Sequence, residues 1–225
     1  MNPRVALIIP AAGSGRRMGG PKAFLELAGR PVLAHTLEPF LRDARVNWVV
    51  VALDPETAER PPAWLTGCDQ RIAVVAGGAD RMTSVRNALD AVPADAGIIV
   101  VHDAARPLVT DALVARAIDA AAAGRAVTAA VPVDDTIHDV AADGRIVATP
   151  GRARFWRAQT PQAFPAERLR AAHRAAGAGG EQATDDAALV ARWAGPVHVI
   201  EGERENFKLT VPADVPMAEA LLRLR

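Results

Sequence analysis

The chain has 225 residues, half of them apolar, and its 26 basic residues balance its 26 acidic residues to give a formal net charge of zero. This length and apolar content allow one sizeable core, and we expect a single domain over residues 1–225. Without an overall basic field, binding to nucleic acid or to an anionic membrane is not expected, and a polyanionic ligand has to be held by a local group of cations.

The composition also bears on where the protein works. Cys68 is the single cysteine, so an intrachain disulfide is excluded. No apolar run approaches the roughly 20 residues that a membrane-spanning helix needs, and no signal-peptide pattern precedes the first apolar strand. We therefore expect a soluble, cytoplasmic protein.

The first ordered feature is an apolar run over residues 5–10 that is typical of a buried strand. The loop after it, residues 11–22, holds four glycines and three cations, Arg16, Arg17 and Lys22. Glycines let backbone N–H groups approach a phosphate while the cations supply charge. The loop matches neither the dinucleotide fingerprint nor the nucleoside-triphosphatase loop. A tight surface turn with solvated arginines is the alternative, and for an isolated glycine-rich loop it would be the better one.

Strands then alternate with helices as far as residue 133. The apolar periodicity predicts a helix over 31–42, a strand over 46–53, a short helix over 55–65, a strand over 71–75, a helix that begins near Asp80 or Thr83, a strand over 97–101, a helix over 110–121 and a strand over 126–133. Such alternation is typical of an α/β fold with a mainly parallel sheet and helices on both faces. Ligands in these folds lie beyond the carboxyl ends of the strands, where residues 11–22 are expected.

A second glycine turn, Gly77–Gly78, follows the strand over 71–75. Backbone groups of this turn and the Ser84 hydroxyl could contact the edge of a flat base. The alternative is an ordinary strand-to-helix turn with an N-cap, and the spacing alone favours it.

Asp103 directly follows the predicted strand over 97–101. A carboxylate at this position is suited to Mg²⁺, which prefers oxygen ligands and shares them with substrate phosphates. It could instead pair with Arg106 or cap the helix that opens at Thr110, but the cationic loop at 11–22 favours the metal. The neighbouring His102 is interpreted as a hydrogen-bonded structural residue and is left out of the site.

Residues 134–160 break the alternation of strands and helices. Two alternating segments flank Asp143–Gly144, a strong hairpin signal, and predict a protruding β-arm. Its apolar residues must either fold back on the core or lie on another subunit; we favour the second, and hence a homodimer. The arginines and aromatics at 152–157 are interpreted as a loop that packs its aromatics and turns its arginines to a small anion, rather than as a site for single-stranded nucleic acid.

The remainder is predicted to contain a helix over 165–176, a flexible link over 177–180, a helix capped by Thr184, Asp185 and Asp186 that ends at Trp193, a strand over 197–200 and a final helix from Pro212. By itself, Thr184 is a plain helix cap. Lys208, with three glutamates nearby in the sequence, would ordinarily be an ion-pair partner on a solvated surface.

Taken together, these motifs resemble those of the 2-C-methyl-D-erythritol 4-phosphate cytidylyltransferases of the non-mevalonate isoprenoid pathway. The matches run in order along nearly the whole chain: Pro10-Ala11-Ala12-Gly13-x-Gly15-x-Arg17-Met18 with Pro21-Lys22, Val101-His102-Asp103-Ala104-Ala105-Arg106-Pro107, Pro132-Val133-x-Asp135-Thr136, Thr160-Pro161-Gln162, Thr184-Asp185, and Glu201-Gly202 with Asn206-x-Lys208. The first two together are specific for this family and its close sugar-phosphate relatives. The resemblance implies a Rossmann-like fold of the nucleotide-diphospho-sugar transferase type with the β-arm at about 134–160.

The resemblance also implies a reaction, in which CMP passes from CTP to methylerythritol phosphate with release of pyrophosphate. It implies these roles: Arg17, Lys22 and Lys208 in catalysis; Asp103 as the ligand of Mg²⁺; Ala11, Ala12, Gly13, Gly15, Gly78, Ala79, Ser84 and Ala104 in nucleotide binding; and Arg106 and Thr184, with Thr136 and Arg152 from the arm of the second subunit, in binding the polyol phosphate.

Two departures from the family pattern stand out. The segment Met18–Pro21 is short, and Ala79 replaces a polar residue, so that only its backbone is expected to contact the base. Two other functions are compatible with parts of the pattern. One is cytidylyl transfer to another polyol phosphate such as ribitol 5-phosphate; the other is non-catalytic nucleotide binding, for which a lost cation would be expected.

Overall fold

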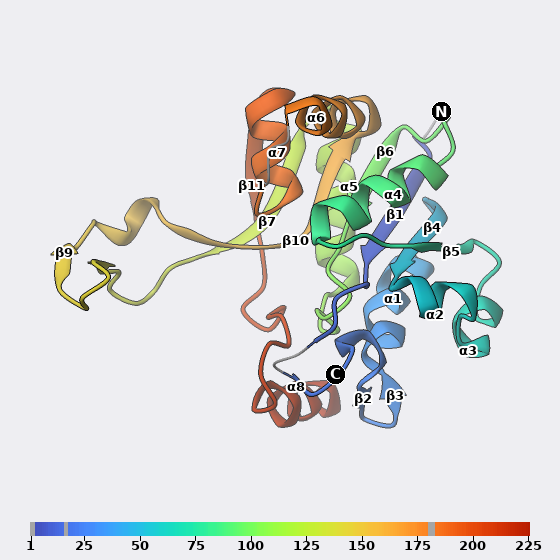
Figure 1. Cartoon of the computed structure of the whole chain (residues 1–225), viewed down its shortest axis with the longest axis horizontal. Coiled ribbons are helices and arrows are strands. Elements are labelled where there is room, and N and C mark those ends of the chain that lie inside the picture. The colour runs from blue at the N-terminus through green and yellow to red at the C-terminus, as the bar shows by residue number, and fades with distance from the viewer. Residues whose placement is uncertain (1–2, 16–17, 180–182) are drawn as a thin grey trace.

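A twisted sheet of seven strands forms the centre of the molecule (Figure 1), here in a computed structural model that describes residues 3–15, 18–179 and 183–225. The strands are β1 (Val5–Pro10), β4 (Val46–Leu53), β5 (Ile72–Ala76), β6 (Ile98–Val101), β7 (Ala126–Pro132), β10 (Trp156–Pro165) and β11 (Val197–Glu201), in the order β11-β7-β10-β6-β1-β4-β5. β1 pairs in parallel with β4 on one side and with β6 on the other. Successive strands are therefore added first on one side of β1 and then on the other, so β1 borders the topological switch point of the sheet. Ligands bind at such a switch point in α/β folds.

Helices cover both faces, as the alternation predicts. α1 (Val32–Arg42) and α5 (Asp111–Ala122) pack on one face, whereas α4 (Arg81–Ala91), α6 (Ala166–Gly179) and α7 (Asp186–Trp193) pack on the other. Within β1, Val5, Leu7 and Ile9 join the first layer, and Ala6 and Ile8 join the second. All five are fully buried, because a central strand with both faces covered needs apolar residues at every position.

One predicted helix and one predicted link differ in the structure. Residues 55–65 form two short helices, α2 (Pro55–Glu59) and α3 (Ala63–Gly67), because consecutive prolines at 61 and 62 prevent one continuous helix. The predicted link at 177–180 is wrong over its first three residues, since α6 continues as far as Gly179. Tertiary packing of α6 overrides the low helix propensity of glycine.

The largest omission in the sequence prediction is β10, which lies where a loop was expected. It runs antiparallel between β6 and β7, so the sheet is mainly rather than wholly parallel. Its register shifts between Ala158 and Gln162, and polar residues such as Gln159 and Thr160 are buried there. Two prolines and these polar side chains hide the strand pattern in the sequence.

A third, smaller hydrophobic cluster packs beneath the carboxyl ends of β1 and β6. It combines the β2–β3 hairpin (Glu26–Leu27 and Arg30–Pro31) with α8 (Asp214–Arg223) through Leu27, Leu209 and Ala218. Leu209 is fully buried in this cluster, and its backbone N–H donates to the carbonyl of Ala105 at 2.8 Å. The segment that carries Lys208 is therefore tied to the sheet edge.

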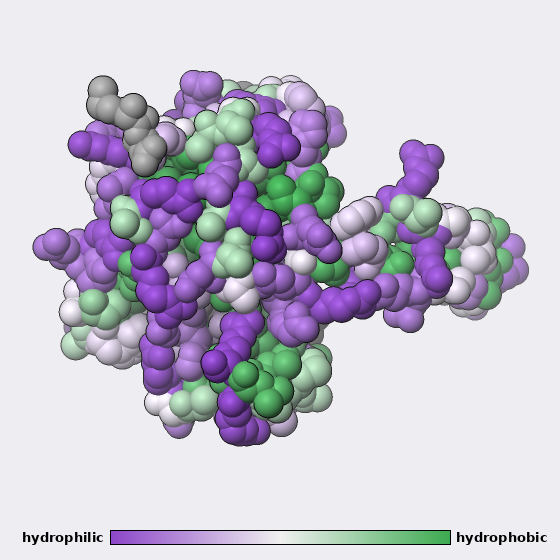
Figure 2. All heavy atoms as spheres, turned by 180° about the vertical axis from the view of Figure 1, so that it is seen from behind, coloured by the Kyte–Doolittle hydropathy of each residue, from purple (hydrophilic) through white to green (hydrophobic). Residues whose placement is uncertain are grey.

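The predicted β-arm projects away from the body of the molecule (Figure 1). Its tip is the antiparallel pair β8 (Asp139–Val140) and β9 (Ile146–Ala148). Val140, Ile146 and Val147 are each more than half exposed, and apolar surface is visible along the arm in Figure 2. The arm therefore does not fold back on the core of its own chain. Within the residues described, no helix is long and apolar enough to cross a membrane.

Candidate active site

The loop after β1 forms one wall of a cavity of about 270 Å³, lined by Ala11, Ala12, Gly13 and Gly15 among others. Ala11 continues the strand pairing by donating its backbone N–H to Ala52 at 2.7 Å. Gly15 has a φ of +58°, and a Cβ there would lie 1.8 Å from the carbonyl oxygen of Gly20, so this turn requires glycine. Arg16 and Arg17 lie outside the described residues.

Lys22 also lines this cavity and connects the loop to a distant part of the chain. It sits in a short 3-10 helix (Lys22–Phe24), and its ammonium donates to the backbone carbonyl of Leu209 at 2.9 Å. The sequence positions of Lys22 and Lys208 are far apart, yet both cations line one cavity.

The second glycine turn closes the opposite wall. Gly77 packs so tightly that a Cβ would lie 2.5 Å from the Cβ of Ala12 and 2.9 Å from the Ser84 hydroxyl. The Ser84 hydroxyl donates to the Asp80 carbonyl at 2.8 Å and accepts from the Gly78 N–H at 3.0 Å. Ser84 thus shapes the turn, and Gly78, Ala79, Ser84 and Ala104 all line the cavity. The result is a wall of small residues and backbone edges that suits a flat base.

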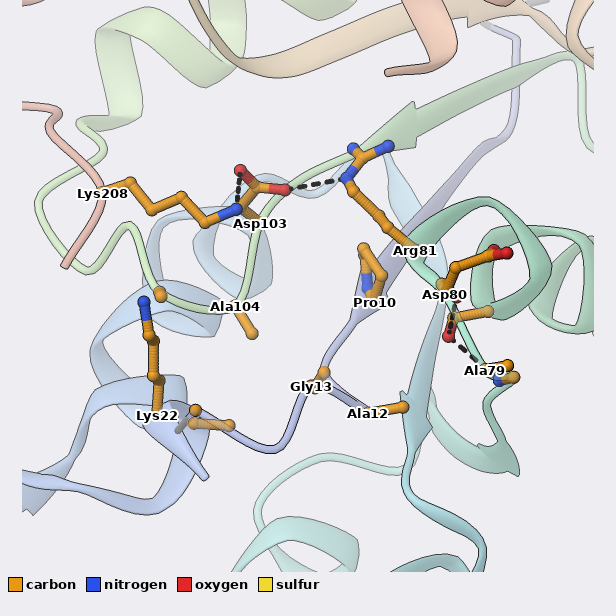
Figure 3. A pocket seen from close by; sticks show the side chains of 16 residues that line it. Pro10, Ala12, Gly13, Lys22, Ala79, Asp80, Arg81, Asp103, Ala104 and Lys208 are labelled. Atoms are coloured by element: carbon orange, nitrogen blue, oxygen red, sulfur yellow. Dashed lines mark hydrogen bonds and ion pairs between the residues drawn. The ribbon is translucent and has the colours of Figure 1, made fainter. Parts of the chain in front are cut away.

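Asp103 follows β6 and meets three cations, of which Lys208 and Arg81 are seen in Figure 3. Its Oδ1 lies 3.1 Å from Arg81 Nε, whereas its Oδ2 lies 3.0 Å from Lys208 Nζ and 3.4 Å from Arg106 Nε. Burial alone would raise the pKa of Asp103, but the charges of Lys208, Arg81 and Arg106 together hold that pKa below its ordinary value. The carboxylate is therefore ionised at neutral pH.

His102 is buried and hydrogen-bonded, as the sequence analysis expects. Its Nε2 lies 3.3 Å from the carbonyl oxygen of Arg106, which can only accept, so Nε2 carries the hydrogen. Its Nδ1 then accepts from the Thr160 hydroxyl at 2.9 Å. Burial lowers the pKa of His102 to about 3, so the ring is neutral at neutral pH and has a structural role.

The segment that carries Lys208 is held by Asn206, which is fully buried. The side-chain amide of Asn206 donates to the Thr160 carbonyl at 2.8 Å, and the backbone carbonyl of Asn206 accepts from Arg106 at 2.8 Å. Lys208 itself stays 41% exposed. The backbone near Lys208 is thus fixed by Asn206, whereas the ammonium group of Lys208 can exchange one partner for another.

A second cavity of about 250 Å³ adjoins the first, and the predicted residues Arg106 and Thr184 both line it. Three residues, Arg81, Asp103 and Lys208, line both cavities and form their common wall. Thr136 and Arg152 line neither cavity; they are exposed on the arm, where Arg152 contacts the backbone carbonyl of Asp134. The N-cap of α7 is Asp185 rather than Thr184.

Arg81 is the main residue of the site that the sequence analysis misses. It is the first residue of α4, directly after the N-cap Asp80. The available signal was a cation in the first turn of a helix that opens at the same sheet edge as Asp103. That signal is weak, because most cations at helix ends are solvated.

As for a metal, no group of three or more His, Cys, Asp or Glu side chains is arranged as a metal site within the described parts of the chain. Asp103 therefore offers a single carboxylate. This number suits Mg²⁺, which is often bound through one or two carboxylates with substrate phosphates completing the shell.

Comparison with known proteins agrees with the architecture and with the motifs. Residues 5–224 match the family model described as 2-C-methyl-D-erythritol 4-phosphate cytidylyltransferase. The chain is 48% identical to the protein of that name from Symbiobacterium thermophilum over 97% of its own length and 92% of the relative's. The structure of 2-C-methyl-D-erythritol 4-phosphate cytidylyltransferase from Thermus thermophilus is 36% identical and superposes with a TM-score of 0.82 over 96% of this chain and 98% of that one.

A second solved structure extends the similarity to a more distant sequence. The 4-diphosphocytidyl-2C-methyl-D-erythritol synthase from Anaerococcus prevotii is 28% identical, with a TM-score of 0.87 over 99% of this chain and 100% of that one. The match thus covers the sheet, the arm and both cavities. On these grounds the chain belongs to the 2-C-methyl-D-erythritol 4-phosphate cytidylyltransferase family.

Proposed function

We propose that this protein transfers CMP from CTP to 2-C-methyl-D-erythritol 4-phosphate, giving 4-diphosphocytidyl-2-C-methyl-D-erythritol and pyrophosphate. The observation that carries the proposal is the common wall of the two cavities, because a reaction between two phosphates needs cations at the point where its substrates meet. Two cations, Arg81 and Lys208, line that common wall together with the carboxylate of Asp103, which supports the proposal.

In the reaction, a phosphate oxygen of the polyol phosphate attacks the α-phosphorus of CTP. A new P–O bond forms, the bond between the α-phosphorus and its bridging oxygen to the β-phosphorus breaks, and pyrophosphate leaves with that electron pair. The attacking phosphate is already ionised, so no general base is needed. The neutral, buried His102 is consistent with this chemistry.

The chain's own residues would act by alignment and charge neutralisation. Ala11, Ala12, Gly78, Ala79 and Ser84 would bind the cytosine with the small residues and backbone edges of the first cavity, beside Gly13, Gly15 and Ala104. Lys22 and Lys208, with Arg17, would bind the triphosphate and stabilise charge on the α-phosphorus. Arg106 and Thr184 would bind the polyol phosphate in the second cavity.

Asp103 would hold Mg²⁺ together with phosphate oxygens of CTP, and the metal would neutralise phosphate charge. The fit rests on the ionised carboxylate at the wall of the nucleotide cavity. Because Lys208 occupies Oδ2 in the structure, this role requires Lys208 to turn from Asp103 towards the phosphates.

We further propose a homodimer in which the arm completes the partner's site with Thr136 and Arg152. Support comes from the exposed apolar residues of the arm and from the absence of both residues from the cavities of their own chain, as far as the described residues go. In such a dimer the whole chain would be one nucleotidyltransferase domain, and the arm would be its dimerisation element.

A substrate screen tests the function. Purified protein is incubated with CTP and Mg²⁺ and with either methylerythritol phosphate or ribitol 5-phosphate, and pyrophosphate release is measured. We expect turnover with the first polyol phosphate. Preferential turnover with ribitol 5-phosphate would change the substrate, and binding of CTP without turnover on either would indicate a non-catalytic nucleotide-binding protein.

A further inference from the structure

Arg81 is fixed by two carboxylates that come from different parts of the fold. Its Nε lies 3.1 Å from Asp103 Oδ1, and one of its terminal nitrogens lies 2.6 Å from Asp186 Oδ2. Figure 3 shows Arg81 meeting Asp103 from the side opposite Lys208. Because a guanidinium is planar and donates in fixed directions, two such contacts set both its position and its rotation.

Asp186 is itself held from behind. It is the first residue of α7, its side chain is 1% exposed, and its other oxygen lies 2.8 Å from Nε2 of the buried His173 on α6. Burial opposes ionisation of Asp186, but Arg81 and His173 hold its pKa below the ordinary value. A continuous polar chain, Asp103–Arg81–Asp186–His173, thus joins the cavity wall to the packed helices.

We propose that Arg81 is a positioning residue for Asp103, and that Asp186 is the anchor that allows it to act as one. This inference rests on the proposed cytidylyl transfer. Lys208 approaches Asp103 from the exposed side and has to leave when it binds a phosphate, whereas Arg81 is tied to Asp186 and stays. Arg81 therefore keeps the carboxylate at the common wall of the two cavities while CTP and its metal bind.

Two variants change this contact from opposite ends. Arg81→Lys keeps the positive charge but loses the planar fork, so that it cannot reach both carboxylates with the same geometry. Asp186→Asn keeps the shape of the anchor and removes its charge. Asp186 lines neither cavity, and its side chain contacts Arg81 and His173, so we expect its effect on Asp103 to pass through Arg81.

Arg71→Lys is a matched control. The Arg71 side chain is 24% exposed, against 25% for Arg81, and it pairs with Asp69 at 2.6 Å. It also donates to the carbonyls of Val46 and Leu41 and lines neither cavity. Arg71→Lys therefore removes a similar, partly buried guanidinium–carboxylate pair at a position away from the site.

The measurement separates positioning from general loss of structure. Calorimetric titration gives the Kd for CTP with Mg²⁺ and with EDTA, and the ratio of the two is the gain due to metal. We expect Arg81→Lys and Asp186→Asn to reduce this gain by about tenfold, as for residues that orient a metal ligand, and to leave the Kd in EDTA within about threefold of the wild type. Arg71→Lys should keep the wild-type gain.

Steady-state turnover gives the second readout. We expect kcat to fall by about tenfold in both variants, with the KM for the polyol phosphate little changed. The inference is overturned if either folded variant, checked by thermal melting, keeps kcat and the metal-dependent gain within about twofold of Arg71→Lys. An inactive wild-type protein would instead refute the proposed function, and the calorimetric comparison would still decide the role of Arg81.

Discussion

Mixed dimers give the sharpest test of whether the arm of one subunit serves the site of the other. Lys22 lines the cavity of its own chain, whereas Arg152 lies on the arm outside that cavity. If Arg152 acts across the interface, a dimer of one Lys22→Ala subunit and one Arg152→Ala subunit has one site that lacks both residues and one site that is intact. Each parent homodimer has no intact site.

The expected recovery follows from this count. Random reassociation of equal amounts yields mixed dimers as about half of all dimers, and each has one working site of two, so pooled activity should reach about a quarter of the wild type. Dimers purified through a different affinity tag on each subunit should reach about half. Pyrophosphate release with CTP and methylerythritol phosphate measures both values.

A pairing within one chain provides the control. Lys22 and Lys208 line the same cavity, so dimers of Lys22→Ala and Lys208→Ala subunits should have two defective sites and show no recovery. If verified mixed dimers of Lys22→Ala and Arg152→Ala also stay inactive, Arg152 belongs to the site of its own chain or to none, and the shared site is wrong.

Three further predictions concern single residues. Lys22→Ala should abolish cytidylyl transfer and leave the thermal unfolding transition cooperative; near-normal turnover would contradict the mechanism. Because the pKa of His102 is about 3 in the fold and 6.5 in the unfolded chain, the unfolded state binds the extra proton first as pH falls, so stability should drop by about 2 kcal/mol from this group between pH 7 and 5. The free energy of unfolding, measured in urea at several pH values, should fall between pH 7 and 5 by that amount more in the wild type than in His102→Asn. An equal fall in both proteins would exclude the low pKa of His102. Gly77→Ala places a Cβ against Ala12 and should lower the free energy of unfolding by about 1–3 kcal/mol in the same assay. Gly67→Ala has open space at its Cβ and should not lower it in this way.

The sequence predicts those elements whose local pattern agrees with their final environment. β1 and β6, and β4 from Trp48 onward, are continuous apolar runs because both faces of the central sheet are covered. α1 and α5 show helical spacing because each buries one face. β10 does not follow this rule. Its buried Gln159 and Thr160 hydrogen-bond to neighbouring loops, and its Gln162 accepts from the first turn of α7, so hydrophobic periodicity cannot reveal this strand.

The site divides in a similar way. The cationic loop and Asp103 are visible because unusual residues lie at the ends of apolar strands, but Lys208 is not, since a lysine near glutamates is common on a surface. Its place beside Asp103 depends on the pairing of β11 with β7 and on the burial of Asn206, both of which are long-range contacts. Only the family resemblance pointed to Lys208 in advance.

The three cations paired with Asp103 differ in how readily each can leave the carboxylate and bind a phosphate instead. The side chains of Arg106 and Arg81 are only 10% and 25% exposed, and Arg81 is also held by Asp186. The side chain of Lys208 is 41% exposed, so water and a bound phosphate can reach its ammonium more readily than they can reach the two guanidinium groups. Binding of a triphosphate should therefore release Lys208 first and leave the two arginines in place. Asp103 limits repulsion among these cations, and we expect it to lose only Lys208 when a triphosphate binds.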